Sequence, residues 1–242
     1  DLALIAFEEA IQLNPSYGEA WAFHSEALQQ NGENGYVSLQ KALELTPDSV
    51  LVRSLAAVYW RRQGDPQKAL EYLYANLEVE PDQAVWVLEI GNTIAEDGDI
   101  PLALTYLEQA ANLDAQDPYY WRSLAVFCSQ HQIEIYTIGF PAARRALILA
   151  PEDSLALDTM GWLLFVQGDE YSSERFLVHA LQNDSNNPLI HYHLGLLYLQ
   201  RTDNLKAYDH LVQVRLHSSP SSELGVLADR LIALYLSTGT IQ

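Results

Sequence analysis

The 242-residue sequence has few of the residues and runs that mark several protein classes. It contains one cysteine, Cys128, which excludes an internal disulfide framework. No apolar run approaches the length of about eighteen residues that a membrane-spanning helix needs, and no signal-peptide pattern is present. Hydrophobic residues still make up 49% of the chain and aromatic residues 10%, enough for a sizeable core. We therefore expect a folded chain without direct membrane insertion.

Basic residues are also scarce. Thirteen lysines and arginines stand against 32 aspartates and glutamates, which gives a net charge of −19, and most of the excess lies in residues 1–117. Binding to a phosphate backbone needs arrays of basic side chains, so nucleic acid is excluded as a partner. An acidic surface favours a basic partner or serves solubility alone.

The motifs of catalysis and cofactor binding are missing as well. The glycines form no dinucleotide or phosphate-binding loop, and no serine lies in a nucleophile elbow. Histidines are dense near the C-terminus, but His191 and His193 would lie about 200° apart on a helix, too divergent for a joint metal site. We expect no catalytic residue, no metal and no cofactor.

What the sequence does contain is a regular repeat. Similar phrases end successive helical segments, and their last residues are separated by 32, 34, 34, 36, 34 and 34 positions. Those residues are Pro15, Pro47, Pro81, Ala115, Pro151, Ser185 and Ser219. A period of about 34 residues with a helix-turn-helix pattern is typical of tetratricopeptide repeats.

Small residues at fixed places strengthen this resemblance. The first helices of successive repeats carry Ser25, Ala57, Gly91, Ala125, Gly161 and Gly195, and the second helices carry Gly35, Ala69, Ala103, Gly139, Ser173 and Ala207. Two helices approach closely only where no bulky side chain stands between them. The chain thus resembles the tetratricopeptide-repeat proteins over nearly its whole length.

The resemblance implies an all-α fold, a right-handed α-solenoid of stacked antiparallel helix pairs. We expect a single array over residues 1–242, with a half repeat at 1–17, full repeats at 18–49, 50–83, 84–117, 118–153, 154–187 and 188–221, and a capping helix at 222–237. Gly64-Asp65, Gly98-Asp99 and Gly168-Asp169 should end one helix and cap the next. The segment 128–141 lacks such a break, and we expect a longer helix or a protruding loop around 132–140.

Residues 154–187 form the clearest copy of the repeat. Apolar residues recur at steps of three and four on both sides of Gly168-Asp169. The predicted inward stripe of the first helix is Leu157, Met160, Gly161 and Leu164, and that of the second is Phe176, Leu177, Ala180 and Leu181. A lone helical hairpin cannot bury both stripes, so the unit needs neighbours of its own kind.

A second stripe on the first helices is the candidate binding site. In tetratricopeptide arrays the first helices line a concave groove, so the resemblance implies that their non-core residues contact ligand. The predicted residues are Tyr119 and Arg122, then Leu155, Asp158, Trp162 and Phe165, then Leu189, Tyr192 and Leu196, with Val126 and Ser129 on the same face. Such an apolar and aromatic strip is typical of an interaction site, and packing between repeats is the alternative. Trp162 is the expected anchor, as an exposed indole in the groove.

The N-terminal half offers a secondary polar patch at Arg61, Arg62 and Asn92. Some family members grip the terminal carboxylate of a chaperone peptide with a clamp of lysines, asparagines and an arginine. Asn92 occupies one suitable place, but Ser123 and Leu155 stand where the next asparagine and lysine belong, so chaperone-tail recognition is disfavoured. Arg61 and Arg62 would grip an acidic side chain or simply be solvated.

These observations favour a non-enzymatic scaffold that binds a protein or peptide in its concave groove. One alternative is a regulatory or substrate-docking domain of a larger enzyme or membrane protein, since the chain lacks an initiator methionine and opens on half a repeat. Another is self-association through apolar ends, at Leu2, Ile5 and Phe7 and at Val226, Ile232 and Tyr235. A cytoplasmic location and a place in the soluble part of an envelope protein are both compatible with the composition.

Overall fold

The computed structural model describes residues 2–219 and 221–236, and every regular element among them is helical. Asp1, Pro220 and residues 237–242, which the predicted array includes, lie outside the described residues. The chain divides into two compact units, Asp1–Asp114 and Ala115–Gln242. Within the described part, no helix combines the length and the apolar character needed to cross a bilayer.

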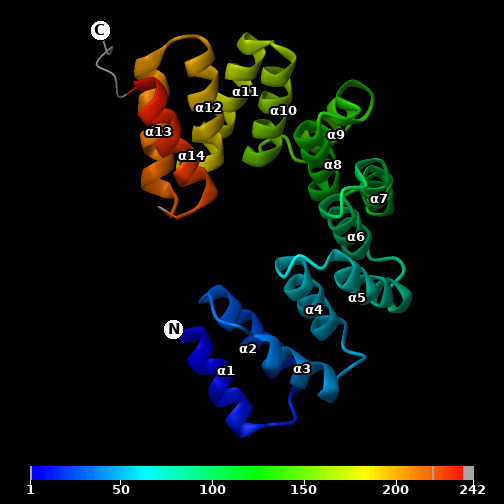
Figure 1. The fold of residues 1–242 in the computed structure, drawn as a ribbon. Helices are drawn as coiled ribbons and strands as arrows, with labels where there is room; N and C mark the ends of the chain where they lie inside the picture. Colours follow the sequence, from blue (N-terminus) through cyan, green and yellow to red (C-terminus); the bar gives the residue numbers. More distant parts are fainter. Residues whose placement is uncertain (1, 220, 237–242) are drawn as a thin grey trace. The chain divides into compact units, whose positions relative to one another are not determined.

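The first unit consists of consecutive packed helices (Figure 1). They are α1 (Leu2–Leu13), α2 (Gly18–Gln30), α3 (Tyr36–Leu45), α4 (Val50–Arg62), α5 (Pro66–Val79), α6 (Ala84–Glu96) and α7 (Ile100–Leu113). The main pairs are α2 with α3, α4 with α5 and α6 with α7, and α1 packs on α2. On α1, Leu2 and Ile5 are exposed as expected, whereas Phe7 stacks on Phe23 with ring centroids 5.3 Å apart.

The second unit repeats this arrangement. It contains α8 (Pro118–His131), the π-helical turn η1 (Ile135–Gly139), α9 (Phe140–Leu149), α10 (Ser154–Gln167), α11 (Glu170–Asn183), α12 (Pro188–Gln200), α13 (Asn204–His217), α14 (Glu223–Leu231) and the π-helical turn η2 (Ile232–Leu236). The pairs are α8 with α9, α10 with α11 and α12 with α13, and α14 packs on α13. The structure is thus all-α and built from packed consecutive helix pairs, as the sequence predicts.

The three Gly-Asp turns have the predicted form. Gly64, Gly98 and Gly168 adopt left-handed φ angles of +73°, +99° and +87°, which residues other than glycine rarely adopt. Each following aspartate accepts a hydrogen bond from a backbone N–H of the next helix; Asp169, for example, accepts from Ser172 N. The glycine ends one helix in a left-handed conformation, and the aspartate caps the N-terminus of the next. The chain therefore reverses its direction within two residues.

Small residues allow the helices of a pair to touch. A Cβ added to Gly161 would lie 2.8 Å from Cγ of Leu177, and one added to Gly195 would lie 2.9 Å from Cγ of Leu211. Because real Cβ atoms do not approach other atoms so closely, these positions require glycine at the present helix spacing. The small-residue pattern in the sequence therefore has the steric cause proposed for it.

The inward stripe of α10 differs in detail from the prediction. Leu157 and Gly161 are buried, but Met160 and Leu164 are only half-buried, and Leu163 is the fully buried leucine instead. The reason is that α10 packs on α8, α9, α11 and α12, so more than one of its faces is covered. A helix with apolar residues on every side gives no single direction for its core.

The segment around 132–140 is neither a longer helix nor a protruding loop. The helix α8 ends at His131, Gln132 and Glu134 take left-handed φ angles of +52° and +47°, and η1 then runs directly into α9. The two extra residues of this repeat are thus absorbed by a tight reversal and a wide helical turn.

Candidate functional site

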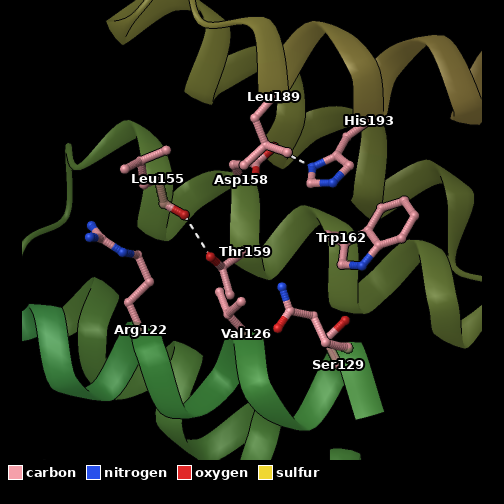
Figure 2. Close-up of a pocket in the computed structure, with 10 residues that line it drawn as sticks. Arg122, Val126, Ser129, Leu155, Asp158, Thr159, Trp162, Leu189 and His193 are labelled. Atoms are coloured by element: carbon pink, nitrogen blue, oxygen red, sulfur yellow. Dashed lines mark hydrogen bonds and ion pairs between the residues drawn. The ribbon is translucent and has the colours of Figure 1, made fainter. Parts of the chain in front are cut away.

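A pocket of about 320 Å³ lies on the second unit, where the first helices of three consecutive pairs, α8, α10 and α12, come together (Figure 2). It is lined by Arg122, Val126, Ser129 and Gln130 from α8, by Leu155, Asp158, Thr159 and Trp162 from α10, and by Leu189 and His193 from α12. Its walls combine aliphatic and aromatic surface with a few polar atoms. That composition is common in binding pockets.

A buried aspartate–histidine pair forms the polar centre of the pocket. Nδ1 of His193 lies 2.8 Å from Oδ1 of Asp158, and the two residues are 9% and 2% exposed. The contact joins α12 to α10 across 35 sequence positions. Because a neutral imidazole that donates from Nδ1 has an acceptor at Nε2, this pair presents an imidazole acceptor beside a carboxylate.

Trp162 lies in a stack of aromatic rings beside this pair. Its ring centroid is 4.3 Å from that of His193, with an angle of 16° between the planes, and 5.0 Å from that of Phe165. The indole is half-buried rather than fully exposed, and Figure 2 shows it next to His193 at the edge of the pocket. Stacking therefore fixes the orientation of the predicted anchor.

The arginine of the pocket is already paired. Nη1 of Arg122 donates to Oδ2 of Asp153 at 2.9 Å, while Oδ1 of Asp153 accepts from the backbone of Leu155 and caps α10. Both side chains of this ion pair are partly buried. The positive charge of Arg122 is thus largely balanced within the protein.

Two hydroxyl groups differ in their use. Thr159 donates to the carbonyl oxygen of Leu155 at 2.7 Å, as Figure 2 shows. Ser129 is 5% exposed, and its Oγ has no hydrogen-bond partner among the described residues. A buried hydroxyl without a partner costs free energy.

The structure brings five of the nine residues predicted for the groove into this pocket: Arg122, Leu155, Asp158, Trp162 and Leu189. The stripe residues Val126 and Ser129 line it too. The other four predicted residues are not part of its lining: Tyr119 is exposed, Phe165 stacks behind Trp162, and Tyr192 and Leu196 are half-buried. Burial raises the pKa of the Tyr192 hydroxyl, with a further rise from the nearby Glu223 carboxylate.

Gln130, Thr159 and His193 line the pocket although the repeat pattern does not point to them. The sequence shows no partner for His193, so its spacing indicates only an ordinary surface or core histidine. A signal is nevertheless present, since a shift of one repeat from Asp158 leads to Tyr192, the neighbour of His193. Positions 34 residues apart, and their immediate neighbours, therefore include Asp158 and His193 as a possible pair.

The secondary polar patch of the first unit is internally paired. Arg61 bridges Glu89, at 2.7 Å, and Glu96, and Arg62 bonds Glu26 at 2.6 Å. Hydrogen bonding to Glu96 is the main reason that the pKa of Arg61 is raised. Asn92 is half-buried. Both guanidinium groups are therefore already paired with carboxylates of the chain.

Histidines meet elsewhere on the second unit. Nδ1 of His191 lies 2.9 Å from Nδ1 of His210, and Nε2 of His191 lies 3.0 Å from the carbonyl oxygen of Ser185. Since a carbonyl can only accept, His191 donates from Nε2 and His210 donates from Nδ1. Among the described residues, no group of three or more histidine, cysteine or acidic side chains has an arrangement that could hold a metal ion.

Comparison with known proteins gives matches in structure alone. No protein-family model and no curated protein matches the sequence. The yeast Tom70 crystal structure matches with a TM-score of 0.75 and 14% identity, over 93% of this chain and 48% of that one. A chain of the Cut9-Hcn1 hetero-tetramer of APC/C matches with a TM-score of 0.69 and 17% identity, over 95% and 45%.

A third match is to a whole protein of similar architecture. TTC0263, a thermophilic TPR protein of Thermus thermophilus, aligns with a TM-score of 0.64 and 17% identity, over 77% of this chain and all of that one. The chain thus spans about half the length of the Tom70 and Cut9-Hcn1 chains and aligns with TTC0263 from end to end of the latter. With its packed helix pairs and its 34-residue period, the chain has the fold of the tetratricopeptide-repeat proteins.

Proposed function

We propose that this chain is a non-enzymatic scaffold that binds a protein partner by holding a peptide segment of it in the pocket formed by α8, α10 and α12. The observation that carries this proposal is the pocket itself, which lies where the first helices of three consecutive pairs meet. A segment crossing these helices would contact every pair in turn. The matched Cut9-Hcn1 structure is an assembly of two different proteins, which favours a protein partner here as well.

The make-up of the pocket supports a peptide as ligand. Val126, Leu155, Leu189 and Trp162 supply apolar surface. Asp158, His193 and Gln130 supply polar atoms that could fix the register of a bound chain. Aromatic side chains in partly desolvated sites commonly dominate binding energy at interfaces, so Trp162 should carry the largest single share.

A binding role also accounts for the aspartate–histidine pair. A catalytic pair of this kind needs a nucleophile within hydrogen-bond reach of the imidazole. Among the described residues, the polar contact of the His193 imidazole is with Asp158. We therefore assign the pair to ligand binding rather than to acyl-transfer chemistry.

The test uses the 242-residue chain as bait for a random twelve-residue peptide library displayed on phage. Peptides recovered on the wild-type protein are synthesised, and their dissociation constants are measured by calorimetry. Trp162→Ala should weaken binding at least tenfold, because it removes the indole that lines the pocket. Trp162→Phe, which keeps a ring in the stack, should weaken it less.

Tyr171→Ala is the matched control. Tyr171 is an aromatic residue on α11 that is 71% exposed and does not line the pocket, so its removal should leave peptide affinity unchanged. Helical circular dichroism of all variants checks the fold. Equal affinities of the wild-type and Trp162→Ala proteins, or failure to recover any specific peptide, would argue against the proposal.

A further inference from the structure

The pocket offers donors, from Gln130 and the Trp162 indole, and acceptors, of which the Asp158 carboxylate is the charged one. Asp158 uses Oδ1 to accept from His193, and no other described residue donates to its carboxylate. A carboxylate can accept several hydrogen bonds, so a buried one with a single donor is under-satisfied. Nε2 of His193 is a second acceptor in the neutral imidazole that donates from Nδ1.

The charged groups of the pocket leave it with a net negative charge. The lining contains two side chains with a fixed charge, Arg122 and Asp158, and Arg122 is balanced by Asp153. With a neutral His193 imidazole, the net charge left among these groups is that of the Asp158 carboxylate. The unit that carries the pocket, residues 115–242, holds 13 acidic and 8 basic side chains, so its own field also attracts cations.

The walls suit a long side chain with an apolar stem. Val126, Leu155 and Leu189 line the pocket with aliphatic groups, and Trp162 adds aromatic surface. Lysine and arginine bury their methylene groups against such surface while the charged head reaches polar atoms. An acidic side chain would instead face the Asp158 carboxylate in a poorly hydrated site, where like charges repel strongly.

We propose that the pocket of α8, α10 and α12 takes a lysine or arginine side chain of the bound peptide, whose charged head lies against Asp158 and Nε2 of His193. This inference rests on the proposed function and specifies its ligand. The aliphatic stem lies between Val126, Leu155 and Leu189.

The experiment uses the peptides selected on the wild-type chain. Each basic residue of a peptide is replaced by norleucine, which keeps the stem and removes the charge. One position should show a loss of at least tenfold in affinity, the size expected for a charge-assisted hydrogen bond. In Asp158→Asn, which keeps an acceptor oxygen for His193 but removes the charge, the lysine and norleucine peptides should bind within about threefold of each other.

Two outcomes would overturn the preference for a basic side chain while leaving peptide binding in the pocket intact. If selected peptides depend on Trp162 but no basic position matters, the pocket binds peptides and its preference for a cation is wrong. If a basic position matters equally in the wild-type and Asp158→Asn proteins, the charged head lies elsewhere.

The fold of Asp158→Asn is checked independently because Asp158 is buried. The indole N–H signals of Trp21, Trp60, Trp86 and Trp121 in a ¹⁵N–¹H spectrum should keep their positions. If they move, Asp158→Glu provides the second arm, since it retains the charge. Preserved discrimination between the lysine and norleucine peptides in that variant supports the inference, and its loss contradicts it.

Discussion

Trp162 lies flat against His193, with ring centroids 4.3 Å apart and planes inclined by 16°. The contact joins α10 to α12, and His193 in turn holds Asp158 of α10 through its Nδ1. One imidazole thus connects the aromatic and the ionic parts of the pocket. A substitution at any of these three residues should therefore alter the orientation of the other two side chains.

The aspartate–histidine pair should contribute to stability as well as to binding. Asp158→Ala leaves the buried Nδ1–H of His193 without an acceptor, and we expect a loss of about 2–3 kcal/mol in the free energy of unfolding. Asp158→Asn retains an acceptor, and its loss should be about 1 kcal/mol or less. Urea denaturation followed by circular dichroism measures both. Equal losses for the two variants would mean that the hydrogen bond is unimportant.

Gly161 should be intolerant of the smallest side chain. An added Cβ would meet Cγ of Leu177 at 2.8 Å and its backbone N at 3.2 Å, so α10 and α11 would have to move apart. We expect Gly161→Ala to lower the free energy of unfolding by about 1–3 kcal/mol. In an open helix the same change would raise it by about 1 kcal/mol. The sign of the change, measured by denaturation, therefore decides whether the close contact exists.

Two adjacent arginines of α4 should differ in importance. Arg61, with a side chain 23% exposed, bridges Glu89 and Glu96, whereas Arg62 is 44% exposed and pairs with Glu26 alone. Arg61→Ala leaves two carboxylates facing each other, and we expect a loss of about 1–2 kcal/mol, compared with about 0–1 kcal/mol for Arg62→Ala. Thermal denaturation at low and high salt compares the two. A larger effect at Arg62 would refute this ranking.

The His191–His210 contact predicts a stability that declines in mild acid. Burial, and then the neighbouring His191, lower the pKa of His210 from its usual value of 6.5 to about 4. The unfolded chain then binds more protons than the folded one between these values. The stabilisation that depends on a neutral His210 is therefore complete above about pH 6.5, and it is lost from the free energy of unfolding as the pH falls toward 4. A lowering of this size corresponds to about 3 kcal/mol at full burial, which solvent screening of a partly exposed ring reduces to about 1–2 kcal/mol.

The measurement for this prediction is the free energy of unfolding at several pH values between 4 and 7. The wild-type chain is compared with His210→Gln, whose amide can still donate to Nδ1 of His191 but does not titrate. Other acidic and histidine groups affect both proteins alike. The decline of the wild-type chain should exceed that of the variant by about 1–2 kcal/mol. Parallel profiles would mean that His210 titrates normally.

Much of the fold could be predicted because its determinants are local. Each Gly-Asp turn needs one residue that tolerates a left-handed φ and one short carboxylate, and both are visible at Gly168-Asp169. The small residues at fixed positions, such as Gly161, likewise reflect a steric condition repeated in every pair. A period of 34 residues then extends one local solution along the chain.

The packing direction of α10 and the chemistry of the pocket were harder to foresee. Because α10 is apolar on all sides, its periodicity did not distinguish Leu163, which is buried, from Leu164, which is half-buried. The Asp158–His193 pair depends on side-chain reach between different repeats, and no local pattern encodes it. Sequence reasoning found the helices that form the pocket and missed the histidine at its centre.

If peptides bind in the pocket beside Trp162, the indole N–H signals of the chain's tryptophans should report it. A peptide selected on the wild-type protein is titrated into ¹⁵N-labelled chain, and each indole signal is assigned by a Trp→Phe variant. We predict a saturable shift of the Trp162 signal with the affinity measured by calorimetry, while the signals of Trp21, Trp60 and Trp86 stay in place. A saturated complex in which the Trp162 signal has not moved would mean that the peptide does not bind beside Trp162.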